Sequence, residues 1–159
     1  MAVAEKKPSV KPIEKEAGYE EWLQAVNALI DDVEMWAREW LISTGWTPAY
    51  GWDVLKRNIE IADEFSTDLY PVEVLEINSR PDDIKLGRDT KLVLEPVFYK
   101  PVTGIGRVDF YVWPAMYRVR LLHKTGRDKW IVKTDSHVNW PLPWNQESFI
   151  LIAEDLLGI

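Results

Sequence analysis

The chain has 159 residues, a net charge of −7, 47% hydrophobic residues and no cysteine. This length suits one domain able to bury roughly 70% of the surface of the unfolded chain. The lack of cysteine excludes disulfides, zinc–thiolate sites, iron–sulfur clusters and cysteine nucleophiles. No apolar run approaches the ~18 residues that would cross a bilayer, and the first residues lack a secretory pattern, so we expect no membrane contact and a cytoplasmic location.

Residues 1–18 are rich in lysine, glutamate and proline, a composition typical of a flexible charged tail before a single domain spanning 19–159. From 19 to 44, apolar residues recur at steps of three and four, which predicts a long helix that ends near Gly45 and Pro48. This periodicity favours a place in the core over a ligand-binding cluster. The apolar face comprises Trp22, Leu23, Val26, Leu29, Ile30, Val33, Trp36, Ala37, Trp40 and Leu41.

Between residues 52 and 134 the apolar period changes to two, which predicts strands separated by turn-forming residues. Connections in the second half are too short for crossover helices, so these strands are expected to be antiparallel. The first segment is ambiguous, since 53–58 would also suit one or two helical turns. The expected strands are 53–61, 69–77, 91–99, 105–113, 116–123 and 129–134.

The segments 105–113 and 116–123 fit a hairpin in one register, because a shift by one residue would separate both its apolar and its charged pairs. We expect the apolar face of this hairpin to pack on the helices. On the other face, an exposed Asp109–Arg120 pair would contribute about 0.2 to 1 kcal/mol. The predicted cross-strand pairs are Val108 with Leu121, Phe110 with Val119, Asp109 with Arg120, and Tyr111 with Arg118.

The sequence "HVNWPLPWNQESF" (137–149) precedes a second predicted helix. Asn145 suits the N-cap, Glu147 complements the helix dipole, and Gly158 ends the helix. We interpret residues 140–144 as an extended strap stiffened by proline, with Trp144 packing on Phe149; the alternative is a loop that lines a pocket. Together these elements predict an α+β fold. A long N-terminal and a C-terminal helix would cover one face of an antiparallel meander of five to six strands.

Motifs for chemistry are incomplete. His123 and His137 do not form a metal-binding pattern, so we expect no metal and no cofactor, although Glu95 and Asp109 would meet if their strands were adjacent. The metal-dependent nuclease pattern, an Asp before a strand carrying Asp/Glu-x-Lys, is not completed by residues 80–85 or by Asp109. Phosphate-binding glycine loops and a serine-hydrolase elbow are missing as well.

Two classes of function remain open. The first is a small acidic interaction module without enzymatic activity, whose net charge would suit a basic protein partner; nucleic acid is disfavoured by the same charge. The second is a small-ligand-binding or hydrolytic enzyme with a pocket between sheet, strap and first helix, where Asp109, His137 and Arg120 are the catalytic candidates. The module is favoured because no catalytic spacing is found. Its candidate binding residues, on the open sheet face or the strap, are Arg107, Tyr111, Arg118, Arg120, Trp140 and Trp144.

Overall fold

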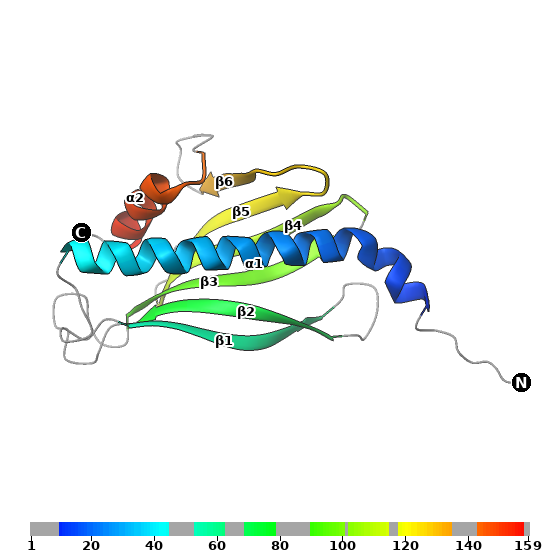
Figure 1. The fold of residues 1–159 in the computed structure, drawn as a ribbon, viewed down its shortest axis with the longest axis horizontal. Coiled ribbons are helices and arrows are strands. Elements are labelled where there is room, and N and C mark those ends of the chain that lie inside the picture. Colours follow the sequence, from blue (N-terminus) through cyan, green and yellow to red (C-terminus); the bar gives the residue numbers. More distant parts are fainter. Residues whose placement is uncertain are drawn as a thin grey trace, which may run out of the picture.

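The computed structural model describes residues 10–44, 53–62, 69–78, 90–100, 102–114, 118–134 and 143–157. Their architecture confirms the predicted fold class: a six-stranded antiparallel sheet with an N-terminal and a C-terminal helix packed against it (Figure 1). The elements are α1 (Val10–Thr44), β1 (Asp53–Ala62), β2 (Leu69–Asn78), β3 (Lys91–Lys100), β4 (Ile105–Trp113), β5 (Arg118–Lys124), β6 (Trp130–Thr134) and α2 (Gln146–Leu157).

The sheet is a simple meander in which each strand pairs with the next along the chain, in the order β1 to β6. The ambiguous segment 53–58 belongs to a strand, since all ten residues of β1 pair with β2. The register of β3 against β4 shifts between Pro96 and Phe98, a bulge that leaves the two strands otherwise paired. Residues 116 and 117 of the predicted fifth strand lie outside the described residues.

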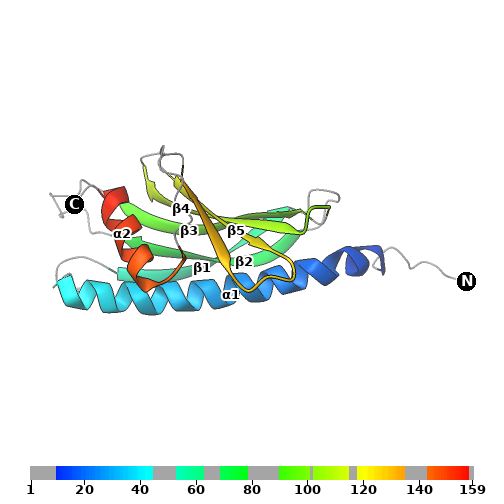
Figure 2. The same ribbon diagram turned by 90° about the horizontal axis from the view of Figure 1, so that it is seen from above.

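Helix α1 runs along one side of the sheet, and no described helix lies on the opposite side (Figure 2). It begins at Val10 rather than at Tyr19, so part of the expected tail is helical. Pro12 falls in the first turn, where backbone N–H groups have no intrahelical acceptor and proline is tolerated. The predicted stops Gly45 and Pro48 lie outside the described residues. No described helix is long and apolar enough to span a membrane.

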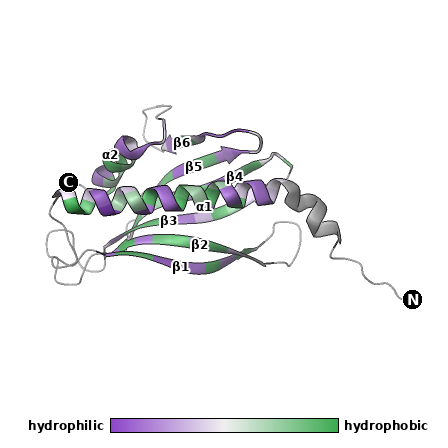
Figure 3. Ribbon diagram, in the orientation of Figure 1, coloured by the Kyte–Doolittle hydropathy of each residue, from purple (hydrophilic) through white to green (hydrophobic). Residues whose placement is uncertain are grey.

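The predicted apolar face of α1 is buried, and hydrophobic segments alternate with hydrophilic ones along this helix (Figure 3). Trp22 and Trp40 are among the largest fully buried side chains. Burial of about 200 Å² of apolar surface would stabilise the fold by about 5 kcal/mol for each of these side chains, before the cost in conformational entropy. Trp22 lies so close to β4 that a Cβ on Gly106 would overlap its indole ring. Glycine therefore allows the helix to approach the sheet at this point.

Aromatic rings join α2 to the sheet. Phe149 stacks on Phe110 of β4 with ring centroids 5.6 Å apart, and Trp144 contacts both rings edge-on. Trp36 of α1 packs on Trp144 at 6.0 Å and closes the cluster. The apolar face of the predicted hairpin therefore packs on both helices, as expected.

The start of α2 is a reciprocal cap. Asn145 Oδ1 accepts a hydrogen bond from the backbone N–H of Ser148 at 2.9 Å, and Ser148 Oγ accepts one from the N–H of Asn145 at 2.9 Å. This geometry confirms Asn145 as the N-cap and satisfies two donors that a helix end would leave without a partner.

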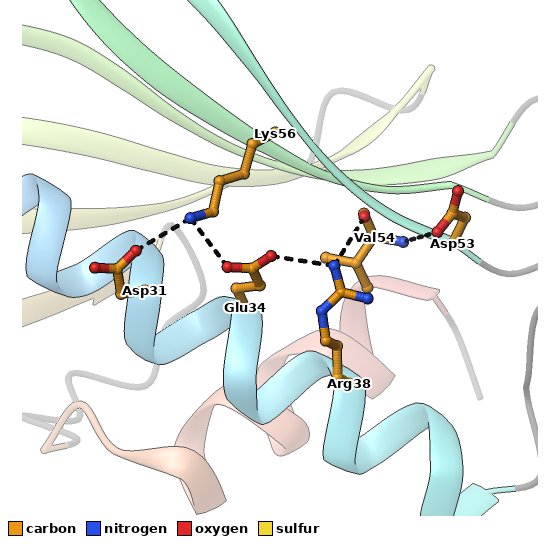
Figure 4. A network of polar contacts seen from close by, with 6 residues as sticks. All are labelled: Asp31, Glu34, Arg38, Asp53, Val54 and Lys56. Carbon is orange, nitrogen blue, oxygen red and sulfur yellow. Dashed lines mark hydrogen bonds and ion pairs between the residues drawn. The ribbon is translucent and has the colours of Figure 1, made fainter.

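A small ionic network fastens the edge strand β1 to α1 (Figure 4). Lys56 Nζ lies 3.1 Å from Asp31 and 3.0 Å from Glu34, and Arg38 bonds Glu34 at 3.1 Å and the carbonyl of Val54 at 3.4 Å. The hydrogen bond from Lys56 lowers the pKa of Glu34, and the same contact raises the pKa of Lys56. Charged contacts of this kind occupy a sheet edge that would otherwise offer its backbone to another strand.

Candidate functional site: the open face of the sheet

The sheet surface away from the helices, called the open face here, carries alternate residues of every strand. The hairpin register is as predicted: Asp109 lies opposite Arg120, and Tyr111 opposite Arg118. Because side chains alternate between the faces, the register of all five strand pairs fixes which residues share this surface. Its central side chains are Leu55, Arg57, Glu76, Lys91, Val93, Glu95, Arg107, Asp109, Tyr111, Arg118, Arg120, Leu122, Ile131 and Lys133.

Asp109 occupies the middle of the open face and is only 1% exposed. Arg107 donates two hydrogen bonds to its carboxylate, at 2.7 and 3.0 Å, and Arg118 donates a third at 2.8 Å. The expectation of an exposed Asp109–Arg120 pair is therefore wrong in two respects. The carboxylate is buried, and its ion pairs are made with a neighbour on its own strand and with a diagonal partner on β5.

The two arginines that neutralise Asp109 also lie over aromatic rings. The guanidinium of Arg118 is 5.2 Å from the ring centroid of Tyr111, and that of Arg107 is 5.8 Å from the ring of Phe98. The planar guanidinium group can bind a carboxylate through its N–H edge and stack through its face at the same time. This double contact positions both arginines across the surface.

Tyr111 is bonded to the next strand. Its hydroxyl donates to Glu95 Oε1 at 2.6 Å. Burial, followed by this hydrogen bond and the negative charge of Glu95, raises the pKa of Tyr111 far above its usual value. The phenol therefore stays protonated at neutral pH and is a poor candidate for a base or nucleophile.

A second buried carboxylate on the open face was not singled out from the sequence. Glu76 is 6% exposed, and its Oε2 lies 2.6 Å from Arg57 Nε and 3.5 Å from Lys91 Nζ. Burial alone would raise its pKa, but the hydrogen bond from Arg57 and the charge of Lys91 outweigh that effect and leave the pKa lowered. Arg57 lies opposite Val74, so Glu76 is its diagonal neighbour, a pairing that the residues of the two strands do not single out without the register.

Glu95 and Asp109, the two carboxylates considered as metal ligands, take part instead in hydrogen bonds that hold the sheet surface together. Glu95 and Asp109 are cross-strand neighbours, but their oxygen atoms accept hydrogen bonds from Tyr111 and the two arginines. Among the described residues, no group of three potential metal ligands occurs. His123 is buried against Trp130, with ring centroids 5.1 Å apart, and pairs with it on the helix-covered face.

The strap candidates lie away from the open face or outside the described residues. Trp144 packs among the rings of the core, so the described part of the space between sheet, strap and α1 is filled by aromatic side chains. Its indole N–H is buried and has no hydrogen-bond partner among the described residues. Trp140 and the catalytic candidate His137 lie outside the described residues.

Charge is divided between the two layers of the molecule. Side chains 18–43 of α1 include six acids and one base, and α2 has three acids and no base. The open face of β4 to β6 instead has one carboxylate, the buried Asp109, and five bases. An overall negative protein therefore has a basic region on its sheet. These five bases are Arg107, Arg118, Arg120, Lys124 and Lys133.

Comparison of the chain with protein-family models, with curated proteins and with solved structures finds no match in any of the three.

Proposed function

We propose that the protein is a small non-enzymatic interaction module that binds a protein partner through the open face of its sheet. The observation that supports this proposal most strongly is the network of ion pairs and cation–π contacts around Asp109. Arginine and aromatic side chains that are held in place before binding lose little conformational entropy in a complex, and they are enriched at protein interfaces.

The alternative, a hydrolytic or small-ligand enzyme, receives less support from the same residues. The Asp109 carboxylate accepts three hydrogen bonds from arginines, and the Tyr111 hydroxyl is engaged by Glu95. A catalytic acid or base needs an available proton site near the substrate. The described part of the pocket expected beside Trp144 is filled by rings.

The lack of cysteine allows a direct test, since a single introduced cysteine is a unique attachment point. Ile131 is 50% exposed on the open face, and Ile42 is 72% exposed on α1. I131C and I42C provide the same substitution on opposite layers of the molecule. Each variant is labelled with a photoreactive maleimide, mixed with an extract of the native host, and irradiated.

A specific cross-linked protein with I131C and none with I42C is the expected result. Competition by excess unlabelled wild-type protein must remove the product, because a specific site saturates. Cross-linking from I42C alone would place the contact on the helices, and the absence of products from both variants would overturn the proposal. Circular dichroism of both variants verifies that each is folded.

A further inference from the structure

The basic patch, defined as Arg107, Arg118, Arg120, Lys124 and Lys133, occupies the half of the open face formed by β4, β5 and β6. The half formed by β1 to β3 differs, because its three bases, Arg57, Lys91 and Lys100, are nearly balanced by the acids Glu76 and Glu95. Arg57 and Lys91 face Glu76, and Glu95 lies beside Asp109. The excess of positive charge is therefore concentrated in the half formed by β4 to β6, although the chain as a whole carries −7.

Cross-strand rows give this patch a regular geometry. Asp109, Arg120 and Lys133 lie directly opposite one another on β4, β5 and β6. Neighbouring strands are about 4.8 Å apart, so cations from adjacent strands form a ladder at a spacing that side chains of one bound segment can reach. Lys124 and Lys133 are exposed, while Arg107 and Arg118 are about three-quarters buried by their contacts with Asp109 and the rings.

Apolar groups border the patch. Ile131 is 50% exposed in the row next to Lys133, and Trp113 is 45% exposed at the end of β4. A surface of positioned arginines with an exposed indole and an isoleucine resembles the centre of a protein interface in composition. A ligand made only of phosphate groups would leave these apolar side chains in water.

Acids within the open face also bear on the choice of ligand. Asp109 and Glu95 are cross-strand neighbours, and Glu76 lies on the next strand. Of these three, Glu95 is partly exposed, so a continuous phosphate backbone that crossed the sheet would pass an acid, which opposes nucleic-acid binding. Carboxylates of a protein segment are discrete, and the charged side chains on the open face of β5 and β6 are all cations: Arg118, Arg120, Lys124 and Lys133.

We infer that the partner of the open face is an acidic protein segment with interspersed apolar residues, whose carboxylates bind the basic patch on β4 to β6. This inference rests on the proposed function and specifies its partner. It replaces the basic partner expected from net charge, since α1 and α2 carry eleven acids against three bases and the partner meets the opposite layer.

The test uses three labelled peptides of about 12 residues, long enough when extended to cross three strands. They repeat Glu-Thr-Glu-Val, Gln-Thr-Gln-Val or Lys-Thr-Lys-Val, and binding to the full chain is measured by fluorescence anisotropy. The patch variant is K124E/K133E. The control is R127E/K129E, which changes two exposed bases in the β5–β6 connection by the same total charge.

The acidic peptide is expected to bind wild type and control alike, and about tenfold more weakly to K124E/K133E. Its affinity is also expected to fall between about 50 and about 300 mM NaCl, because salt screens exposed charges. Both variants must retain the wild-type circular dichroism spectrum and melting temperature to within a few degrees. Equal loss of binding in the patch variant and the control would contradict a localised site.

Other outcomes separate this inference from the proposed function. Equal binding of the glutamine peptide would overturn the acidic partner while leaving the module intact. Failure of all peptides would overturn the inference, and the I131C cross-linking experiment then decides the proposed function independently. Tighter binding of a single-stranded oligonucleotide, lost in K124E/K133E, would overturn the assignment to a protein partner in favour of a nucleic acid.

Discussion

The hydroxyl of Tyr111 and the carboxylate of Glu95 are joined across β3 and β4 by a 2.6 Å hydrogen bond on the half-buried open face. Y111F removes the donor and leaves Glu95 without it. We expect a loss of about 1.5 kcal/mol in the free energy of unfolding, measured in urea, because hydrogen bonds to charged groups exceed the neutral average. No loss of stability would show that water replaces the phenol without cost.

Alkaline pH tests the same bond. The pKa of Tyr111 is raised in the folded protein, so the unfolded chain releases this proton first, from about pH 10. The stability contributed by the protonated phenol is complete below that pH and declines as pH rises further. Absorbance titration of phenolate is expected to show a late-ionising step, and this step should be missing in Y111F.

Replacing Asp109 by Asn preserves its shape but removes the charge that holds Arg107 and Arg118. We expect D109N to lose about 2 to 3 kcal/mol, since a buried charged acceptor is lost while two largely buried cations repel each other. D32N, at an exposed site on α1, serves as the control and should change stability by less than about 0.5 kcal/mol. Equal effects of the two substitutions would contradict a central role for Asp109.

The lowered pKa of Glu76 predicts that the protein loses stability as the pH becomes acidic. Its pKa in the folded protein lies below the ordinary 4.5, so its contribution is present above that pH and declines as pH falls through the folded-state pKa. The free energy of unfolding of E76Q should therefore be lower than wild type at neutral pH. As the buffer is acidified, the free energy of unfolding should also fall less steeply for E76Q than for wild type. Urea titrations at a series of pH values measure this difference. Parallel curves would show that Glu76 is not responsible.

Gly106 lies against the indole ring of Trp22, so G106A places a methyl group against a fully buried side chain. We expect about 1 to 3 kcal/mol of destabilisation by overpacking. The double variant G106A/W22F should be more stable than the sum of its single variants predicts, because the smaller ring makes room for the methyl group. Thermal unfolding of all four proteins completes this cycle, and strict additivity would argue against the contact.

Periodicity predicted the elements of this fold well because the two kinds of element bury their side chains at different spacings. The hairpin of β4 and β5 is the clearest case, since only one register matches Phe110 with Val119 and Asp109 with Arg120, and that register is confirmed. The start of α1 was placed too late. Residues 10–18 offer no apolar stripe, and proline is compatible with a first helical turn.

The burial of Asp109 could not be predicted from the sequence, for a different reason. Alternation assigns a residue to a face, but how deeply it is covered depends on which way its long neighbours extend. Arg107 and Arg118 extend toward the carboxylate and also stack on rings, so a face that no described helix covers still contains a buried charge. A directly opposite residue such as Arg120 is not always the ion-pair partner, because diagonal neighbours are also within reach of long side chains.

Among the described residues, the negative charge of the helices and the basic patch on β4 to β6 lie on opposite sides of the sheet, and together they form a dipole across it. An approaching charged partner would experience a torque as well as an attraction, and would arrive already rotated toward the matching side. Most random encounters between proteins fail for want of orientation, and a field of this shape raises the productive fraction. The isoelectric point of about 4.9 averages this asymmetry away, so two proteins with the same net charge can present different fields to their partners.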